Sequence, residues 1–225
     1  MLSDFVALIF PHLCPACDDA LQRSESVVCT SCRFKLPQTR FHEQADNPVA
    51  RLFWGKAKVH AATAFYHFNK GDKIQRLMHQ LKYKGQPDVG VELGRIMGAT
   101  LAEAELFADV TATVPVPLHP RRQRKRGYNQ AECIARGVAE SMQNTLDINT
   151  LYRAVSNQTQ TRKGKFERWK NVESIFALRE STHLEHGHLL LIDDVVTTGS
   201  TLEACVQQLL KIPGTRVSVA TLALA

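Results

Sequence analysis

Two adjacent carboxylates, Asp193 and Asp194, stand between an apolar run and a turn of small hydroxyl residues. The apolar run, residues 189–192, predicts a buried parallel strand, and apolar residues recur after the turn at the spacing of a helix. Ligands of open α/β sheets bind beyond the carboxyl ends of the strands. Two anionic groups at that place can accept ribose hydroxyls or assist a metal ion.

The turn that follows the two carboxylates suits a phosphate group. Backbone N–H groups at the start of a helix carry partial positive charge and bind anions. The residues that would supply this cradle are Thr197, Thr198, Gly199, Ser200 and Thr201. A binder of vicinal hydroxyls joined to a phosphate cradle in one turn suggests a sugar phosphate. The alternative is an ordinary strand–turn–helix with two solvated aspartates.

Two Cys-x-x-Cys pairs lie near the N-terminus, formed by Cys14, Cys17, Cys29 and Cys32. Such pairs can place four thiolates around one tetrahedral Zn²⁺ ion, whereas two disulfides would require an oxidising compartment. The first residues do not resemble an export signal, and isolated thiols occur at Cys133 and Cys205. The sequence therefore favours zinc over disulfides and predicts a cytoplasmic protein. Four cysteines close the coordination shell, so the ion would be structural.

A second turn, residues 115–119, follows an apolar strand and precedes a cluster of cations. The cluster consists of Arg121, Arg122, Arg124, Lys125 and Arg126. Cations beside a strand end would suit a pyrophosphate, because Arg forms bidentate contacts with phosphate and Lys acts as a point charge. Taken alone, the run is more typical of a solvated face or of a non-specific surface for polyanions.

A further basic stretch, residues 161–170, carries Phe166 and Trp169 among its cations. It is compatible with a mobile lid over an anionic substrate, with an exposed loop, or with a surface for single-stranded nucleic acid. The sequence leaves these alternatives open.

The composition is that of a soluble globular protein. The chain has 225 residues, of which 44% are hydrophobic and 22% are charged, and a formal net charge of +6. No apolar run is long enough to span a bilayer, so we expect no membrane insertion. The mild positive charge is compatible with phosphorylated small molecules or nucleic acid and requires neither.

Strand patterns alternate with helix patterns, which predicts a mostly parallel sheet flanked by helices. We expect strands near residues 59–68, 110–117, 149–155, 173–178, 188–194 and 216–224. We expect helices near residues 1–13, 74–81, 88–105, 129–141 and 200–211, with Asp72 as a helix cap and residues 82–85 as a basic turn. A zinc module over residues 1–45 would precede the main domain over residues 56–225, with residues 37–48 as a polar linker.

The residues from Asp193 to Thr201 resemble, over the whole segment, the 5-phosphoribosyl-1-pyrophosphate (PRPP) signature of type I phosphoribosyltransferases. The chain as a whole resembles the ComF/GntX family of bacterial proteins. The matching features are the four cysteines, residues 81–85, 114–117 and 126–130, Thr159-Gln160-Thr161 with Arg168 and Asn171, and the signature itself. That family is regarded as joining an N-terminal zinc finger to a type I phosphoribosyltransferase domain. Its founding members are linked to uptake of transforming DNA in competent bacteria.

The resemblance implies roles for the residues at the two turns. Asp193 and Asp194 would hold the ribose hydroxyls of PRPP at the catalytic centre, and the turn from Thr197 to Thr201 would hold the 5-phosphate. Val116, Pro117 and Arg126 would face the pyrophosphate, and Mg²⁺ would bridge pyrophosphate and ribose oxygens. A nucleophile would displace pyrophosphate from the anomeric carbon through a cationic state, which Mg²⁺ and the basic turns would stabilise.

The acceptor stays open, because the sequence shows neither a dedicated nucleophile nor a segment that reads a base. Three hypotheses follow. In the first, the chain transfers phosphoribose to an unknown acceptor. In the second, it binds PRPP without turnover and serves DNA uptake through competence proteins or single-stranded DNA. In the third, its phosphate cradle binds DNA backbone phosphates. The sequence favours the first two and says nothing of oligomeric state.

Overall fold

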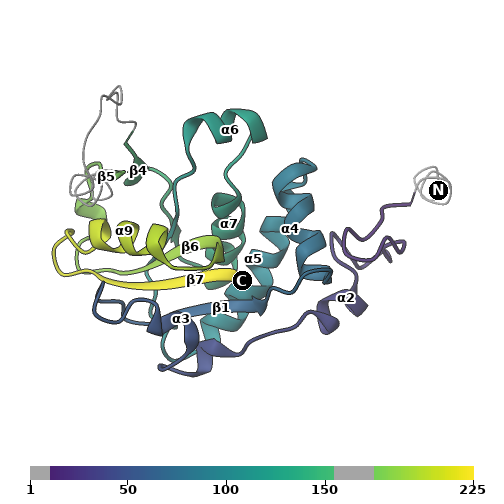
Figure 1. Cartoon of the computed structure of the whole chain (residues 1–225), viewed down its shortest axis with the longest axis horizontal. Coiled ribbons are helices and arrows are strands. Elements are labelled where there is room, and N and C mark those ends of the chain that lie inside the picture. Colours follow the sequence, from purple (N-terminus) through teal and green to yellow (C-terminus); the bar gives the residue numbers. More distant parts are fainter. Residues whose placement is uncertain (1–10, 155–174) are drawn as a thin grey trace.

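A five-stranded, all-parallel sheet forms the centre of the computed structural model, which describes residues 11–154 and 175–225 (Figure 1). The strand order is β1 (Ala62–His67), β7 (Arg216–Leu224), β6 (His188–Val196), β2 (Ala112–Pro115) and β3 (Thr145–Leu146). A separate antiparallel pair consists of β4 (Leu151–Arg153) and β5 (Phe176–Leu178). This arrangement confirms the predicted parallel α/β sheet.

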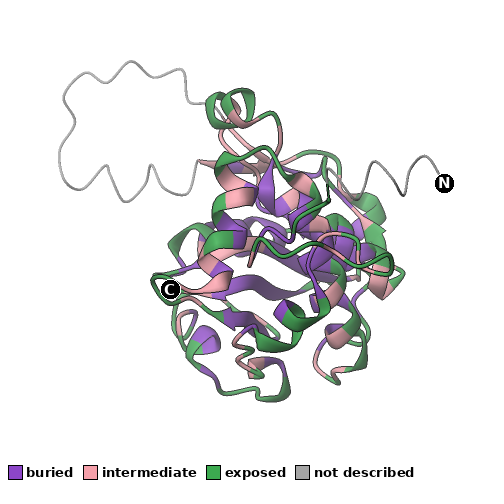
Figure 2. Cartoon of the chain, turned by 90° about the vertical axis from the view of Figure 1, so that its right-hand side faces the viewer, coloured by how far each residue is buried: buried purple, intermediate pink, exposed green. Residues whose placement is uncertain are grey.

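Strand β6 lies in the interior of the sheet, with β7 on one side and β2 on the other. Its apolar residues alternate between two cores: Leu190 and Ile192 pack on one face, and Leu189 and Leu191 pack on the other. A strand covered on both faces needs apolar residues at successive positions, which explains the unbroken apolar run (Figure 2).

Helices cover both faces of the sheet. Helices α4 (Lys73–Tyr83), α5 (Pro87–Glu103) and α7 (Gln130–Met142) share one core, and α3 (Pro48–Arg51) and α9 (Ser200–Leu209) share the other. The remaining helical segments are α2 (Thr30–Lys35), α6 (Pro120–Arg126) and two 3₁₀ turns, η1 (Phe41–Glu43) and η2 (Thr182–Leu184). No helix in the described ranges is both long and apolar enough to cross a membrane.

Helices α5 and α7 approach so closely that glycine is required at their contact. A Cβ on Gly94 would lie 2.2 Å from the carbonyl oxygen of Ile134, and a Cβ on Gly137 would lie 2.0 Å from that of Val91. Both distances are far below van der Waals contact, so only glycine allows these backbones to meet.

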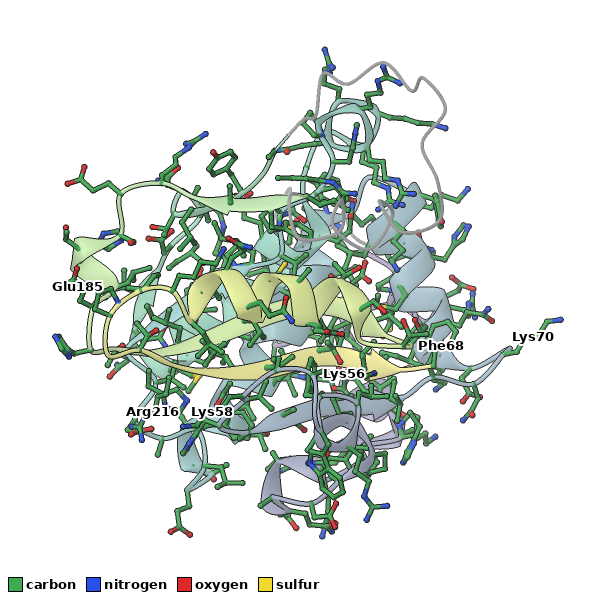
Figure 3. All side chains as sticks on the ribbon, turned by 60° about the vertical axis from the view of Figure 1, so that its left-hand side comes forward. Lys56, Lys58, Phe68, Lys70, Glu185 and Arg216 are labelled. Atoms are coloured by element: carbon green, nitrogen blue, oxygen red, sulfur yellow. The ribbon has the colours of Figure 1, made fainter. Side chains whose placement is uncertain are left out.

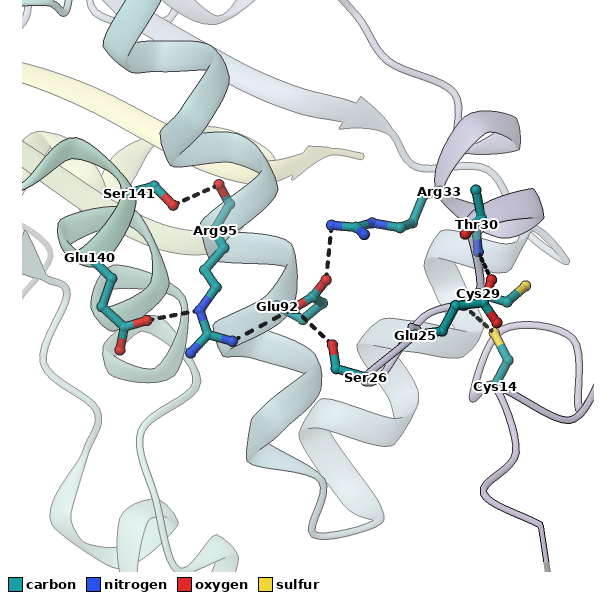
Figure 4. A network of polar contacts seen from close by, with 10 residues as sticks. All are labelled: Cys14, Glu25, Ser26, Cys29, Thr30, Arg33, Glu92, Arg95, Glu140 and Ser141. Carbon is teal, nitrogen blue, oxygen red and sulfur yellow. Dashed lines mark hydrogen bonds and ion pairs between the residues drawn. The ribbon is translucent and has the colours of Figure 1, made fainter. Parts of the chain in front are cut away.

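The four-cysteine segment packs against α4 and α5 and shares their core. Cys32 and Leu36 belong to the same apolar cluster as Leu77. Polar contacts reinforce the packing, because Arg33 lies 3.0 Å from a Glu92 carboxylate oxygen and Ser26 donates to the other at 3.4 Å (Figure 4).

Residues 37–48, expected as a linker, instead line the outer edge of β1. Gln38 forms an antiparallel bridge with Tyr66, and the N–H of Thr39 donates to the carbonyl of Phe65 at 3.0 Å. The Asn47 side chain donates to the carbonyl of Ala62 at 2.8 Å. An exposed strand edge presents unpaired backbone groups, and this segment satisfies part of that edge.

The elements predicted within the described residues are present, with three local corrections. Strand β6 runs to Val196, two residues beyond the expected end at Asp194. Lys82 belongs to the last turn of α4 and not to a loop, and Asp72 occupies the N-cap position without a side-chain cap hydrogen bond. The helix expected over residues 1–13 and the basic stretch 161–170 lie wholly or mostly outside the described residues.

Candidate functional site

The paired carboxylates lie near the carboxyl end of β6. The backbone N–H of Asp194 donates to Oδ1 of Asp193 at 2.8 Å, and both residues are half-buried. Burial raises the pKa of Asp193 to about 7, and the adjacent negative charge of Asp194 adds to the rise. Asp193 therefore changes charge near neutral pH, as few carboxyl groups do.

Lys82 of α4 joins this pair from another layer of the fold. Its Nζ lies 2.9 Å from Oδ2 of Asp194, and the two side chains are only 23% and 17% exposed. Its positive charge lowers the pKa of Asp193 and so partly opposes the effect of burial. The site thus combines two adjacent carboxylates with one ammonium group.

The predicted phosphate turn opens α9 directly after β6. Gly199 has φ +77° and occupies the N-cap position, so no side chain caps the first N–H groups of this helix. Thr197, Thr198, Ser200 and Thr201 are exposed. Together with Asp193, Val195, Val196 and Leu202, the turn lines a hollow of about 60 Å³. Free N–H groups beside a carboxylate suit a ligand that carries both a phosphate and hydroxyl groups.

The second predicted turn lies beside the first because β2 pairs with β6. The N–H of Val116 donates to the carbonyl of Ile192 at 2.8 Å, which places Val116 beside the carboxylate strand. Val116 is buried and Pro117 is half-buried. Asn129 holds this turn in place, since its side chain donates to the Val116 carbonyl at 3.0 Å.

Arg126 ends the basic helix α6, none of whose residues is buried. Its guanidinium donates to Gln130 Oε1 at 2.6 Å and lies 5.4 Å from the ring centroid of Tyr83. Arg126 is therefore held toward α4, while the other cations of α6 point into solvent.

The site lies at one end of the sheet. Figure 3 marks both ends: Lys58 and Arg216 lie where β1 and β7 begin, and Phe68 lies where β1 has ended. The carboxylates of β6 belong to the Phe68 end, since Val196 pairs with Leu224 and Phe68 donates its N–H to the Leu224 carbonyl.

A larger cavity, of about 350 Å³, is lined by residues 53–55 and 57–61 with Ala45 and Ala50. None of the predicted ligand-binding residues lines it. Of the two, the smaller hollow is the one lined by predicted ligand-binding residues, namely Asp193 and the turn from Thr197 to Thr201.

The four N-terminal cysteines converge on one point. Their sulfur atoms all lie within 4.8 Å of one another, and Cys17 Sγ and Cys29 Sγ are 3.7 Å apart. Four sulfurs around a tetrahedral Zn²⁺ would be about 3.8 Å apart, given Zn–S bonds of about 2.3 Å. All six cysteines are free thiols, so the disulfide alternative is not formed. Lys73 also donates to Cys32 Sγ at 3.2 Å, which places a positive charge beside the four sulfur atoms. The cluster fits a structural zinc site.

Comparison with known proteins identifies the family. Over 162 residues the chain is 31% identical to competence protein F of Haemophilus influenzae, covering 68% of this chain and 69% of that protein. The chain belongs to the ComF family. It is also 26% identical over 215 residues to DNA utilization protein YhgH of Escherichia coli K12, covering 92% and 88% of the two chains.

Other comparisons are more limited. Against DNA utilization protein YhgH of Salmonella typhi, the ComF-family chain is 30% identical over 149 residues, which span 65% of each protein. No family model matches the chain. Among solved structures, a glutamine PRPP amidotransferase from B. subtilis matches 64% of this chain and 30% of its own, at 18% identity and a TM-score of 0.44.

Sequence reasoning missed the part that α4 plays at the site of this ComF-family protein. The hydroxyl of Tyr128 donates to the carbonyl of Leu81 at 2.5 Å and so ties the last turn of α4 to the loop after α6. One signal was available, because Lys82 follows Met78 by four positions and therefore borders the buried face of the helix. The family-like residues Thr159, Gln160, Thr161, Arg168 and Asn171 lie outside the described residues.

Proposed function

We propose that this chain binds Mg-PRPP at the carboxyl end of β6 and transfers its phosphoribosyl group to an acceptor, with release of pyrophosphate. The observation that carries the proposal is the shared hollow of about 60 Å³, which Asp193 and the uncapped start of α9 line together. A carboxylate suits hydroxyl groups, and helix N–H groups suit a phosphate. PRPP carries both groups on one pentose.

Each predicted residue has a role in this proposal. Asp193 and Asp194 accept the ribose hydroxyls, and the turn from Thr197 to Thr201 binds the 5-phosphate. Val116 and Pro117 face the pyrophosphate, and Arg126 supplies positive charge nearby. Mg²⁺ binds oxygen ligands and would be held mainly by the pyrophosphate and ribose oxygens of PRPP, where it offsets the charge of the leaving group.

The reaction requires little covalent participation from the protein. The bond from the anomeric carbon to the pyrophosphate oxygen breaks, and pyrophosphate leaves with the electron pair. A bond from the acceptor nucleophile to the same carbon forms, and the acceptor releases its proton to solvent. The carboxylates orient the ribose, and nearby cations stabilise the departing anion.

The names of the relatives suggest a cellular role. Proteins named for competence and DNA utilization align with most of the chain. We propose that this protein likewise serves DNA uptake or use, acts in the cytoplasm, and divides into a zinc module over residues 1–45 and a phosphoribosyltransferase-like domain over residues 56–225. A structural zinc ion on the four cysteines would stabilise the first of these units.

Calorimetric titration with Mg-PRPP tests the proposal, followed by a screen for pyrophosphate release with bases and amines as acceptors. We expect the intact protein to bind Mg-PRPP and the Asp193→Asn, Asp194→Asn double variant to bind it at least tenfold more weakly, because each lost charge-assisted hydrogen bond costs about 1.5–3 kcal/mol. Absence of binding by the intact protein would refute the proposal.

A second candidate function is a PRPP-responsive accessory role without turnover, through competence proteins or single-stranded DNA. The observation that favours it is α6, where the five cations of a seven-residue helix include four that are exposed and none that is buried. Affinity for an oligonucleotide should then fall steeply with salt as counterions are released, and should change when Mg-PRPP is added. An unchanged oligonucleotide affinity at saturating Mg-PRPP would count against DNA as the PRPP-linked partner.

A further inference from the structure

The ion pair between Lys82 and Asp194 brings α4 to the proposed ribose site. The two residues come from different layers of the fold, and their side chains are mostly removed from solvent. An ion pair in such surroundings is screened less than one on an open surface, so it restrains both groups more strongly.

Both partners of this pair are attached to rigid elements. Helix α4 is anchored by the fully buried side chains of Ile74, Leu77 and Leu81. Tyr128 holds the Leu81 carbonyl at 2.5 Å, one residue before Lys82. Asp194 belongs to β6, which is paired on both sides. The ammonium group is therefore held in place by packing on one side and meets a carboxylate of the sheet on the other.

The contacts of Asp194 leave one carboxylate oxygen for a ligand. Its Oδ2 contacts Lys82, and its backbone N–H donates to Asp193. Among the described residues, none donates a hydrogen bond to its Oδ1. A carboxylate held at one oxygen presents the other in a defined direction, which pre-organises it for a hydroxyl.

We propose that Lys82 is a positioning residue for the vicinal hydroxyls of the bound sugar: it holds Asp194 by one oxygen and leaves the other to accept a ribose hydroxyl. This inference rests on the proposed function, because it assigns a role within the same site. The ammonium also offsets the repulsion between two adjacent carboxylates and a ligand that itself carries negative phosphate charge.

The test uses a pair of ligands that differ by one hydroxyl group. Calorimetry compares ribose 5-phosphate with 2-deoxyribose 5-phosphate on the full-length protein and on Lys82→Met, Lys82→Arg and Lys84→Met. We expect the intact protein to prefer ribose 5-phosphate and Lys82→Met to lose most of that preference, with an affinity for ribose 5-phosphate roughly tenfold lower. Lys82→Arg should keep part of the preference, and Lys84→Met, on an exposed lysine of the same segment, should keep all of it.

The outcomes separate this inference from the proposed function. If Lys82→Met lowers the affinity for both ligands by the same factor, Lys82 has only a structural role and the inference is wrong. If the intact protein binds both ligands equally, sugar phosphate binding stands but the inference fails. If it binds neither ligand nor Mg-PRPP, the proposed function fails and takes the inference with it.

A measurement on the intact protein covers the case in which Lys82→Met does not fold. The NMR signal of the Lys82 ammonium, assigned with Lys82→Arg, should shift more with ribose 5-phosphate than with 2-deoxyribose 5-phosphate. Equal shifts with the two ligands would overturn the inference.

Discussion

The backbone N–H of Asp194 donates to Oδ1 of Asp193 at 2.8 Å, so two neighbouring carboxylates of one strand share a single, partly buried environment. Successive side chains of a strand normally point to opposite faces of the sheet. Here a hydrogen bond nevertheless links the two residues, from the backbone of Asp194 to the side chain of Asp193. Burial and the like charge of Asp194 both disfavour ionisation of Asp193 and raise its pKa.

The first prediction concerns pH and stability. The pKa of Asp193 is raised from 3.8 to about 7, so the folded state retains a proton that the unfolded state has lost between those values. The stability that Asp193 contributes is therefore complete below about pH 4 and is lost as the pH rises to about 7. Asp193→Asn should gain stability relative to the intact protein as the pH rises over this range, by up to about 4 kcal/mol.

Urea unfolding at several pH values measures this difference. The difference in unfolding free energy between Asp193→Asn and the intact protein should grow up to about pH 7 and then stay constant. If the unfolding free energies of the two proteins changed with pH in parallel, the pKa of Asp193 would not be raised.

The second prediction concerns the phosphate turn. Gly199 has φ +77°, and an added Cβ would lie 3.4 Å from Leu52 Cβ, so Gly199→Ala strains the backbone that presents the N–H groups. We expect affinity for Mg-PRPP to fall about tenfold and unfolding free energy to fall by about 1–2 kcal/mol. Calorimetry and urea unfolding measure the two effects.

Gly71→Ala is the matched control. Gly71 has φ +91° with open space around it, and it lies before α4, outside the phosphate turn. The Gly71→Ala protein should lose a similar amount of unfolding free energy but keep its affinity for Mg-PRPP. Equal loss of affinity in both variants would mean that general destabilisation, not the turn, governs binding.

The third prediction concerns the cysteine cluster. Cys14, Cys29 and Cys32 belong to the core shared with α4, so loss of a zinc ion should loosen this side of the protein. Cys32→Ser should abolish stoichiometric zinc and lower the unfolding free energy by on the order of 3 kcal/mol, since ligand binding to such a site stabilises the fold. Elemental analysis and thermal unfolding measure both changes.

Phe34→Ser serves as the control for this variant. Phe34 lies on the same short helix and is 87% exposed. The Phe34→Ser protein should retain its zinc ion and its thermal stability. A Cys32→Ser protein with unchanged metal content would contradict the zinc assignment.

The fourth prediction concerns the contact between α5 and α7. Gly94→Ala would place a methyl group 2.2 Å from a backbone oxygen, which side-chain rotation cannot relieve. We expect a loss of about 2–4 kcal/mol in unfolding free energy, as overpacking against a rigid neighbour forces the helices apart. Ala99→Ser, at an exposed position of α5, should change stability by less than about 0.5 kcal/mol. A Gly94→Ala protein as stable as Ala99→Ser would show that the helices can separate without cost.

The sequence by itself determined the features that depend on neighbouring residues. Strand β6, the turn at Gly199 and helix α9 follow from an apolar run, a small-residue turn and a helical spacing, all of which are local. The two Cys-x-x-Cys pairs likewise specify a four-thiolate cluster, because each pair already brings two sulfurs to one side of a short turn.

Only the tertiary structure decided which distant groups meet. The order of the strands, the packing of residues 37–48 on the edge of β1 and the contact of Lys82 with Asp194 all join segments far apart in the sequence. Such contacts depend on how apolar faces are buried together, and many pairings satisfy the same local patterns. The carboxylates of the site could therefore be predicted from their motif, whereas their cationic partner required the packed fold.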